Sequence, residues 1–418
     1  MESKTATLDR RQVYRPFLER LNPSTAGVLE AQDLIVPPEH DPRDPDQPPI
    51  HVAFASTAEL NRGVQMALVG GIGSGKTTEL QLTYKLLARH EDAINIYVDL
   101  GELTDLNALN PGAILIAIGR QLYKHLSKAD EQSDQIKAAY KKLGVLARGE
   151  TTYVAQDQLD PDEYFEDDPG PSFEVVHTPG LLKPRFPAIQ RNVEEVCDLV
   201  IEIAKPLLES ERQITVLIDG LDRLIRPERF REFTEQDLRA LRGTQISIIV
   251  AAPLLLWFDK TRFLQDYFYD FKHIPAAIAD PEKSDFLKQV LVRRGARDRD
   301  LMDEDEISEL SRFSGGVLRD LIALARTSAD AAYRDDKDRI SPAHVRSAIR
   351  QLGKRYLTGL GKIQRKLINH LLENGDYSTE DPVCREMLIN RRVLEHCAEG
   401  RDYFSVHPAL AEVLKESG

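Results

Sequence analysis

Apolar residues gather in five short continuous runs between positions 60 and 280, separated by stretches with helical spacing. Such runs are typical of strands that are buried on both faces of a sheet. Strands that alternate with helices predict a parallel sheet with helices on both sides. We therefore expect an α/β fold with strands at residues 65–69, 94–100, 214–219, 246–252 and 271–278. Helices are expected around them at 52–62, 78–89, 111–126 and 193–209.

The pattern changes after residue 280. Apolar positions then recur at helical spacing in four segments, which predicts a compact helical domain over 280–353. Its expected helices lie at 282–294, 304–313, 316–332 and 341–352. Residues 354–418 combine helices with a short hairpin, an order that is typical of a winged helix. The elements expected there are helices at 363–372, 382–389 and 408–414 and strands at 393–397 and 403–406.

One glycine-rich stretch carries the clearest chemistry. Residues 70–77 read Gly-Gly-Ile-Gly-Ser-Gly-Lys-Thr, the spacing of a phosphate-binding P-loop between a predicted strand and a predicted helix. Its glycines let backbone N–H groups face an anion, and the helix N-terminus adds partial positive charge. Lys76 is expected to reach the β- and γ-phosphates of ATP, and Thr77 to ligate Mg²⁺. The predicted nucleotide-binding residues are Gly70, Gly71, Ile72, Gly73, Ser74, Gly75, Lys76, Thr77 and Thr78.

A second stretch supplies two acids. The apolar run 214–218 ends in Asp219, and Asp222 follows three residues later. The carboxyl end of a parallel strand lies beside a P-loop, so Asp219 is the expected second holder of Mg²⁺, through water. Asp222 is then expected to orient or deprotonate the attacking water. Asp219 and Asp222 are the predicted catalytic acids.

Two segments lack these patterns. Residues 1–50 form an arm and a linker rich in Pro and Asp, and we expect 37–49 to be an extended spacer. Residues 128–192 interrupt the strand–helix alternation with a helix at 132–143 and an acidic segment. Such segments are mostly solvated loops, and a partner-binding or gating role is the alternative. Aromatic residues favour that alternative, namely Tyr153, Tyr164, Phe165 and Phe173. The acids are Asp157, Asp160, Asp162, Glu163, Glu166, Asp167 and Asp168.

Composition sets further limits. The chain has 418 residues and a formal net charge of -13, which opposes non-specific attraction to nucleic acid or anionic lipid. Its three cysteines are far apart, which favours a reducing compartment. The longest apolar stretch, 246–258, is too short to span a bilayer, and the first residues lack the apolar core of a signal peptide. We expect a cytoplasmic protein without a membrane segment, with a core domain at 51–279 followed by the helical and winged-helix parts.

The motifs resemble those of the additional-strand P-loop ATPases, specifically the AAA+ proteins and their relatives, the STAND ATPases. Residues 70–77 match Walker A, and 214–219 match Walker B. Residues 313–320, Phe-Ser-Gly-Gly-Val-Leu-Arg-Asp, look like the sensor 2 segment of origin-recognition-like AAA+ proteins. The resemblance implies that 280–353 is a lid and that Arg319 lies near the γ-phosphate. It also implies that Arg262 is an arginine finger for a neighbouring subunit.

Three features depart from that pattern. Gly220 follows Asp219 where many AAA+ proteins have a catalytic Glu, and Asp222 matches the STAND arrangement instead. The run 246–252 ends in Ala-Ala before Pro253, without a polar sensor 1 residue, which implies slow turnover. No repeat array follows the winged helix. A signal would then be recognised by the insert, the winged helix or another chain.

These observations predict a Mg²⁺- and ATP-dependent switch ATPase, in which ATP bridges core and lid and controls a homo-oligomer or a partner complex. One alternative is a remodeller or loader that reads DNA with the winged helix. Arg385, Arg391 and Arg392 favour DNA, whereas acids on the same helix do not, so DNA is not the favoured partner. A basic cluster lies just upstream, formed by Lys354, Arg355, Lys362, Arg365 and Lys366. The other alternative is a scaffold that binds nucleotide without hydrolysing it.

Overall fold

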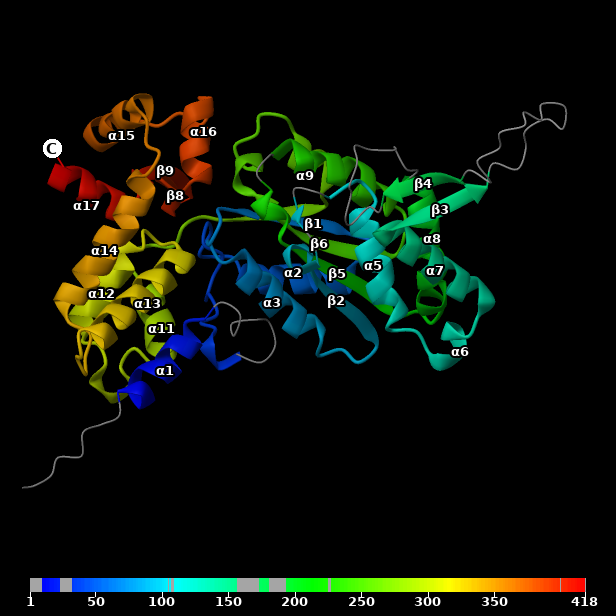
Figure 1. Ribbon diagram of the computed structural model, residues 1–418, viewed down its shortest axis with the longest axis horizontal. Coiled ribbons are helices and arrows are strands. Elements are labelled where there is room, and N and C mark those ends of the chain that lie inside the picture. The colour runs from blue at the N-terminus through cyan, green and yellow to red at the C-terminus, as the bar shows by residue number, and fades with distance from the viewer. Residues whose placement is uncertain are drawn as a thin grey trace, which may run out of the picture.

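The structure is a computed structural model of the chain. It describes residues 10–22, 32–103, 105–106, 109–155, 173–179, 193–224, 227–398 and 400–417. Figure 1 shows a central sheet with helices around it, and a helical part with a small hairpin on one side. None of the described helices combines the length and the apolar character that crossing a bilayer requires.

Five parallel strands form the central sheet, in the order β2-β5-β6-β1-β7. Their bounds are β1 Gln65–Gly70, β2 Ala93–Asp99, β5 Gln213–Asp219, β6 Ile246–Pro253 and β7 Asp270–Ile274. β6 is the additional strand between β1, which leads into the P-loop, and β5, which ends in Asp219. The predicted parallel α/β fold is confirmed. β7 ends earlier than expected, because Pro275 has no N–H with which to continue the ladder.

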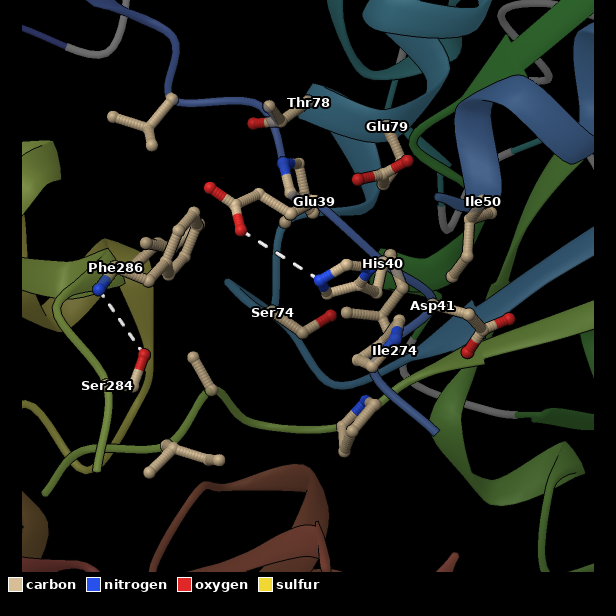
Figure 2. Close-up of a pocket in the computed structure, with 18 of the residues that line it drawn as sticks. Glu39, His40, Asp41, Ile50, Ser74, Thr78, Glu79, Ile274, Ser284 and Phe286 are labelled. Carbon is tan, nitrogen blue, oxygen red and sulfur yellow. Dashed lines mark hydrogen bonds and ion pairs between the residues drawn. The ribbon is translucent and has the colours of Figure 1, made fainter. Parts of the chain in front are cut away.

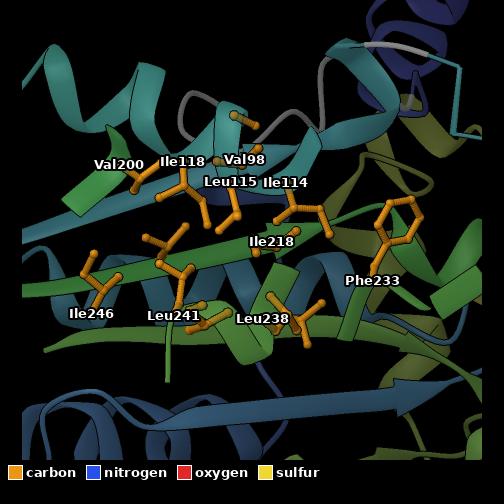
Figure 3. Close-up of a cluster of buried hydrophobic side chains, with 14 of the residues drawn as sticks. Val98, Ile114, Leu115, Ile118, Val200, Ile218, Phe233, Leu238, Leu241 and Ile246 are labelled. Atoms are coloured by element: carbon orange, nitrogen blue, oxygen red, sulfur yellow. The ribbon is translucent and has the colours of Figure 1, made fainter. Parts of the chain in front are cut away.

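Helices cover both faces of the sheet, and strand β1 shows why. Met66 and Leu68 point into a buried cluster with α2 and α3, whereas Ala67 and Val69 point into a larger cluster with α5 and α8. The helices of the first face are α2 Ile50–Leu60 and α3 Lys76–Leu87. Those of the second face are α5 Ala113–Tyr123, α7 Asp134–Arg148 and α8 Val193–Glu209. Figure 3 shows Ile114, Leu115 and Ile118 of α5 packed against strand residues such as Ile218.

The insert differs from its prediction. After α6 Lys128–Glu131 and α7, the chain forms an antiparallel hairpin of β3 Gly149–Ala155 and β4 Phe173–Pro179. A loop was expected here, because these strands carry no clear alternation of apolar and polar residues. The acidic residues from Asp157 to Asp168 lie outside the described residues.

Shorter helices elsewhere are α4 Leu100–Leu103, α9 Pro227–Phe233 and α10 Phe263–Tyr267.

The remaining residues form a second body of the fold. Four helices lie close to those expected over 280–353, and we call them the lid, a role that stays a prediction. They are α11 Phe286–Arg293, α12 Glu304–Phe313, α13 Leu318–Arg334 and α14 Pro342–Leu357. The C-terminal elements are α15 Lys362–Asn374, α16 Pro382–Ile389, β8 Val393–Ala398, β9 Arg401–Val406 and α17 Pro408–Ser417. One hydrophobic cluster includes residues of both groups. α14 runs across the boundary expected at 353/354, and the winged-helix assignment stays a prediction.

The N-terminal arm contributes a helix to this second body. α1 Arg11–Arg20 buries Val13, Tyr14 and Phe17 in the same cluster as the lid helices. The Tyr14 hydroxyl donates to the Lys337 carbonyl at 3.0 Å. α1 therefore packs with the lid helices (Figure 1).

Candidate functional site

The P-loop lies between β1 and α3, as its sequence predicts. Gly73 and Gly75 have φ values of 85° and 113°, a region that side-chain-bearing residues rarely adopt. α3 begins at Lys76, so its free N–H groups and its dipole point toward the loop. The backbone is thus shaped for an anion.

Lys76 is held at this loop by contacts within the chain. Its Nζ donates to the carbonyls of Gly70 at 2.8 Å and Gly71 at 2.6 Å, and it lies 3.0 Å from Asp222 Oδ2. The Lys76 side chain is only 3% exposed. A buried charge of this kind requires partners, and Asp222 supplies the opposite charge. A phosphate that reached Lys76 would compete with Asp222 for it.

Asp219 and Thr77 meet on the other side of the loop. Thr77 Oγ1 donates to Asp219 Oδ2 at 2.7 Å, and the Tyr97 hydroxyl donates to the same oxygen at 2.9 Å. Burial, followed by the negative charge of Asp222, raises the pKa of Asp219. Burial and then the charge of Asp219 raise the pKa of Tyr97, so Tyr97 stays a donor. The arrangement therefore favours a cation beside Asp219.

The donor atoms at this position fit Mg²⁺, which prefers hard oxygen ligands. Thr77 Oγ1 and Asp219 Oδ2 lie within hydrogen-bond distance of each other. Two more buried oxygens, Ser74 Oγ and Asp222 Oδ1, have no hydrogen-bond partner within the described part of the chain. Buried polar atoms are normally satisfied, so water, metal or phosphate at this place would complete the site.

The lid touches the P-loop directly. The N–H of Leu318 donates to the Gly73 carbonyl at 3.0 Å. A Cβ on residue 73 would lie 2.9 Å from both Val317 Cγ1 and Arg319 Cβ, so glycine is what permits this approach. Arg319 is exposed to solvent. Partial burial, followed by the positive charges of Arg391 and Arg223, lowers the pKa of Arg319, and the negative charges of Asp222 and Asp320 oppose this shift.

Arg391 and Arg392 are not on a DNA-facing surface. Arg391 donates to Asp320 Oδ1 at 3.0 Å, and Arg392 donates to the carbonyls of Tyr356 at 3.0 Å and Thr358 at 2.7 Å. Arg385 likewise donates to the Thr379 carbonyl at 2.6 Å. These three arginines thus bind buried or partly buried acceptors within the C-terminal part and the lid, which weakens the alternative that they read DNA.

Arg262 is the predicted site residue that the fold does not bring to the P-loop. It lies exposed at the N-terminus of α10. Its assignment as an arginine finger stays a prediction.

β6 ends as expected in Ala251, Ala252 and Pro253, which are buried.

A cavity of about 420 Å³ adjoins the P-loop and is lined by segments far apart in the sequence (Figure 2). P-loop residues Ser74, Gly75 and Thr78 form one wall, and Ile274 of β7 forms another. The Pro-rich segment contributes residues between Val36 and Pro45. The expectation that 37–49 is a mere spacer is therefore wrong. Further lining residues come from the lid and the C-terminal hairpin, including Phe286, Gln289, Leu318 and Cys397.

The walls of this cavity combine apolar surface with carboxylates. Ile50, Ile274 and Phe286 face it in Figure 2. Glu79 of α3 also lines the cavity. The backbone nitrogen and the ring Nδ1 of His51 each lie 2.9 Å from Glu79 Oε2. Apolar walls with a few fixed acceptors suit a flat ring that carries N–H donors, such as a nucleobase. We call this cavity the nucleoside half of the site, and residues 70–77 with Asp219, Asp222 and Arg319 the phosphate half.

The sequence pattern does not indicate the residues of the nucleoside half. Its members lie on unrelated segments, and the Pro-rich stretch has no periodic pattern. Tyr97 was also missed, although its place two residues before Asp99 on β2 points it toward Asp219, because Asp99 and Asp219 are paired in register.

No protein-family model matches the chain, and no curated protein matches its sequence. The chain is similar to the solved structure of the Aeropyrum pernix ORC2 protein in ADPNP–ADP complexes, with 14% identity over 93% of this chain and 97% of that chain, at a TM-score of 0.45. It is also similar to the Aeropyrum pernix ORC1 protein in complex with DNA, with 14% identity over 96% of each chain, at a TM-score of 0.46.

A third similar structure is Cdc6p from Pyrobaculum aerophilum, with 13% identity over 88% of this chain and 93% of that chain, at a TM-score of 0.40. The chain has the P-loop NTPase fold. Matches at this level indicate nothing about its substrate or partner, which must be argued from its own residues.

Proposed function

We propose that the protein is a Mg²⁺-dependent ATPase that works as a switch between nucleotide states. The observation that carries this proposal is the convergence of Lys76, Thr77, Asp219 and Asp222 beneath a lid that contacts Gly73. These groups supply a cation for phosphate, oxygen ligands for a metal and a carboxylate for water. The cavity beside them has the size and the mixed walls that a nucleoside needs.

Thr77 and Asp219 would hold Mg²⁺, which neutralises charge on the β- and γ-phosphates when it is bound. Lys76 would move from Asp222 to the phosphates. Asp222 Oδ1 has no hydrogen-bond partner among the described residues, so it is free to accept a hydrogen bond from an attacking water. Because β6 supplies no polar side chain at its end, we infer that turnover is slow.

The switch would act through the lid. Arg319 projects from the segment whose Leu318 N–H bonds to the P-loop, so a γ-phosphate would be shared between the core and the lid. Loss of that phosphate would remove the shared contact and shift the orientation of the two bodies. The exposed Arg262 is the residue through which a second subunit would complete the site.

Phosphate release per subunit, measured over a wide range of protein concentration, tests this proposal. Specific activity that rises with concentration would support a site shared between subunits, and Arg262→Ala should then abolish the rise. Constant activity would support a switch that hydrolyses ATP as a monomer. Nucleotide binding without turnover would favour the non-hydrolysing scaffold, and no nucleotide binding would contradict the proposal.

A second candidate function is DNA binding, because the basic cluster on α14 and α15 is exposed. Its members are Lys354, Arg355, Lys362, Arg365 and Lys366. If this cluster contacts phosphates, duplex binding should weaken with salt, and neutralising Arg365 and Lys366 to Gln should lower the salt slope by about one per lost contact. Salt-independent or absent binding would remove this candidate. Arg391 and Arg392 are unsuitable for the test, because they hold the C-terminal part together.

A further inference from the structure

A group of charged and aromatic side chains, with buried His273 and Glu395 at its centre, joins three parts of the molecule. Arg43, from the Pro-rich segment, donates to Asp402 Oδ1 of β9 at 2.6 Å and lies 2.9 Å from His273 Nδ1 of β7. Its guanidinium carbon also lies 4.6 Å from the ring centroid of Trp257. We call Arg43, Trp257, His273, Glu395 and Asp402 the Arg43 cluster.

Further contacts lock the cluster together. Trp257 stacks on His273 with ring centroids 4.5 Å apart, and its Nε1 donates to Asp402 Oδ2 at 3.3 Å. Glu395 of β8 is 2% exposed, with its Oε2 3.3 Å from His273 Nε2 and its Oε1 3.7 Å from the Arg43 guanidinium. The Ala276 N–H donates to the Glu395 carbonyl at 3.0 Å. Without Arg43, the Glu395 carboxylate would be buried without a cation, which is costly.

The same three elements also line the nucleoside half. Asp41 and Pro42 line the cavity, and Arg43 follows them directly. Ile274 lines it next to His273, and Cys397 lines it two residues after Glu395. Each element therefore contributes one residue to the Arg43 cluster and a nearby residue to the cavity wall. Any shift of the hairpin β8–β9 away from β7 must change the cavity wall.

We propose that Arg43 is a positioning residue for the nucleoside, and that filling the cavity and docking of hairpin β8–β9 on the core are one coupled equilibrium. This inference rests on the proposed nucleotide binding. A nucleoside in the cavity packs against the docked arrangement of these elements, so it stabilises docking. By linkage, the factor by which docking raises the affinity for nucleotide is also the factor by which bound nucleotide stabilises docking, so a lower docked population lowers the affinity.

The coupling has a signature that separates it from phosphate recognition. Arg43 acts on the nucleoside half, so its loss lowers the affinities for ADP and for ATP by the same factor. A defect in Arg319 would instead affect ATP more than ADP. A merely structural role for Arg43 would loosen the hairpin equally with and without nucleotide.

Hydrogen–deuterium exchange of residues 393–406, with and without ADP or ATP, tests the coupling in the full chain. We expect either nucleotide to slow exchange in the wild-type protein. In Arg43→Ala, exchange should be faster without nucleotide, and titrations should give affinities for ADP and ATP that are both lower by roughly fivefold or more. Asp402→Asn, which keeps the shape of the side chain, should show the same effects more weakly if Arg43→Ala fails to fold.

Lys260→Ala is the matched control, because the exposed Lys260–Glu380 pair also joins the core to the C-terminal part, at 2.5 Å, and lies outside the cavity lining. It should leave both affinities unchanged. Wild-type nucleotide affinity in both Arg43→Ala and Asp402→Asn, or hairpin exchange that nucleotide does not slow, would overturn the coupling while leaving the proposed function intact. Failure of the wild-type protein to bind any nucleotide would overturn both.

Discussion

The phosphate half and the nucleoside half of the candidate site are built in different ways. The phosphate half is built around one continuous loop, residues 70–77, and the side chains that reach this loop from elsewhere are paired with it in place, as Asp222 with Lys76 and Asp219 with Thr77. The nucleoside half is assembled from segments hundreds of residues apart, whose positions depend on how the hairpin and the lid dock. A local site is rigid and readable from sequence, whereas an assembled site responds to the arrangement of the whole molecule. Four changes test this contrast.

Asp222→Asn should have the largest effect, and on turnover alone. Loss of the carboxylate removes the acceptor for the attacking water, and we expect hydrolysis to fall by roughly 10²–10⁴-fold. ATP affinity should be unchanged or higher, because Lys76 loses its competing partner. Single-turnover phosphate release beside a binding titration measures both. Wild-type turnover would show that another group activates the water.

Lys76→Ala should abolish tight nucleotide binding. The change removes the cation that meets the phosphates and also leaves Asp222 buried without its partner, so we expect a loss of about 10²–10³-fold in affinity. A titration with a fluorescent ATP analogue measures it. Lys85→Ala, on the same helix and away from the loop, is the control and should bind normally. Unchanged ATP affinity in Lys76→Ala would contradict the site assignment.

Arg319→Ala should discriminate between the nucleotides. If Arg319 meets the γ-phosphate, ATP should bind about tenfold more weakly, while ADP is unaffected, because one charge-assisted hydrogen bond is lost. Competition titrations with ADP and ATP give the ratio. Arg326→Ala, farther along α13, removes an exposed charge of the same kind and should change neither affinity. Equal weakening of both nucleotides by Arg319→Ala would assign Arg319 to packing.

Acid should destabilise the fold by a small amount through strand β8, which also contributes Cys397 to the nucleoside half. Burial, followed by the charge of His407, lowers the pKa of His396 in β8 to about 4, below its ordinary 6.5. The unfolded chain therefore binds this proton more readily than the folded chain, so stability is complete above pH 6.5 and declines as the pH falls toward 4. We expect the wild-type melting temperature to fall over this interval by about 2 °C or more beyond that of His396→Gln. Parallel melting curves would argue against a buried neutral His396.

Much of the fold is predictable from sequence, because buried strands and helices leave periodic patterns. The central strands and the lid helices were expected near their observed positions. The P-loop and Asp219 were found because their spacing is local and their neighbours in sequence are also their neighbours in space. The hairpin β3–β4 has no comparable pattern, and it was missed.

The misassigned residues have a common physical cause. In sequence, Arg391 and Arg392 look like surface cations, yet they are drawn inward by Asp320 and by the carbonyls at the end of α14. The segment 37–49 looks like a solvated linker, yet Asp41 is buried and Lys272 lies 3.5 Å from it. Tertiary partners decide these cases, and they lie more than thirty residues away in the chain.

α14 extends from the lid toward the C-terminal elements. The helix has 16 residues and therefore a length of about 24 Å. It begins among the lid helices and ends four residues before α15, whose first turns carry exposed cations. As a stiff lever, it converts a lid rotation of about 10° into a displacement of about 4 Å at its far end, given its rise per residue. Binding or loss of one phosphate at Gly73 would thus displace the charged surface at the opposite end of the second body.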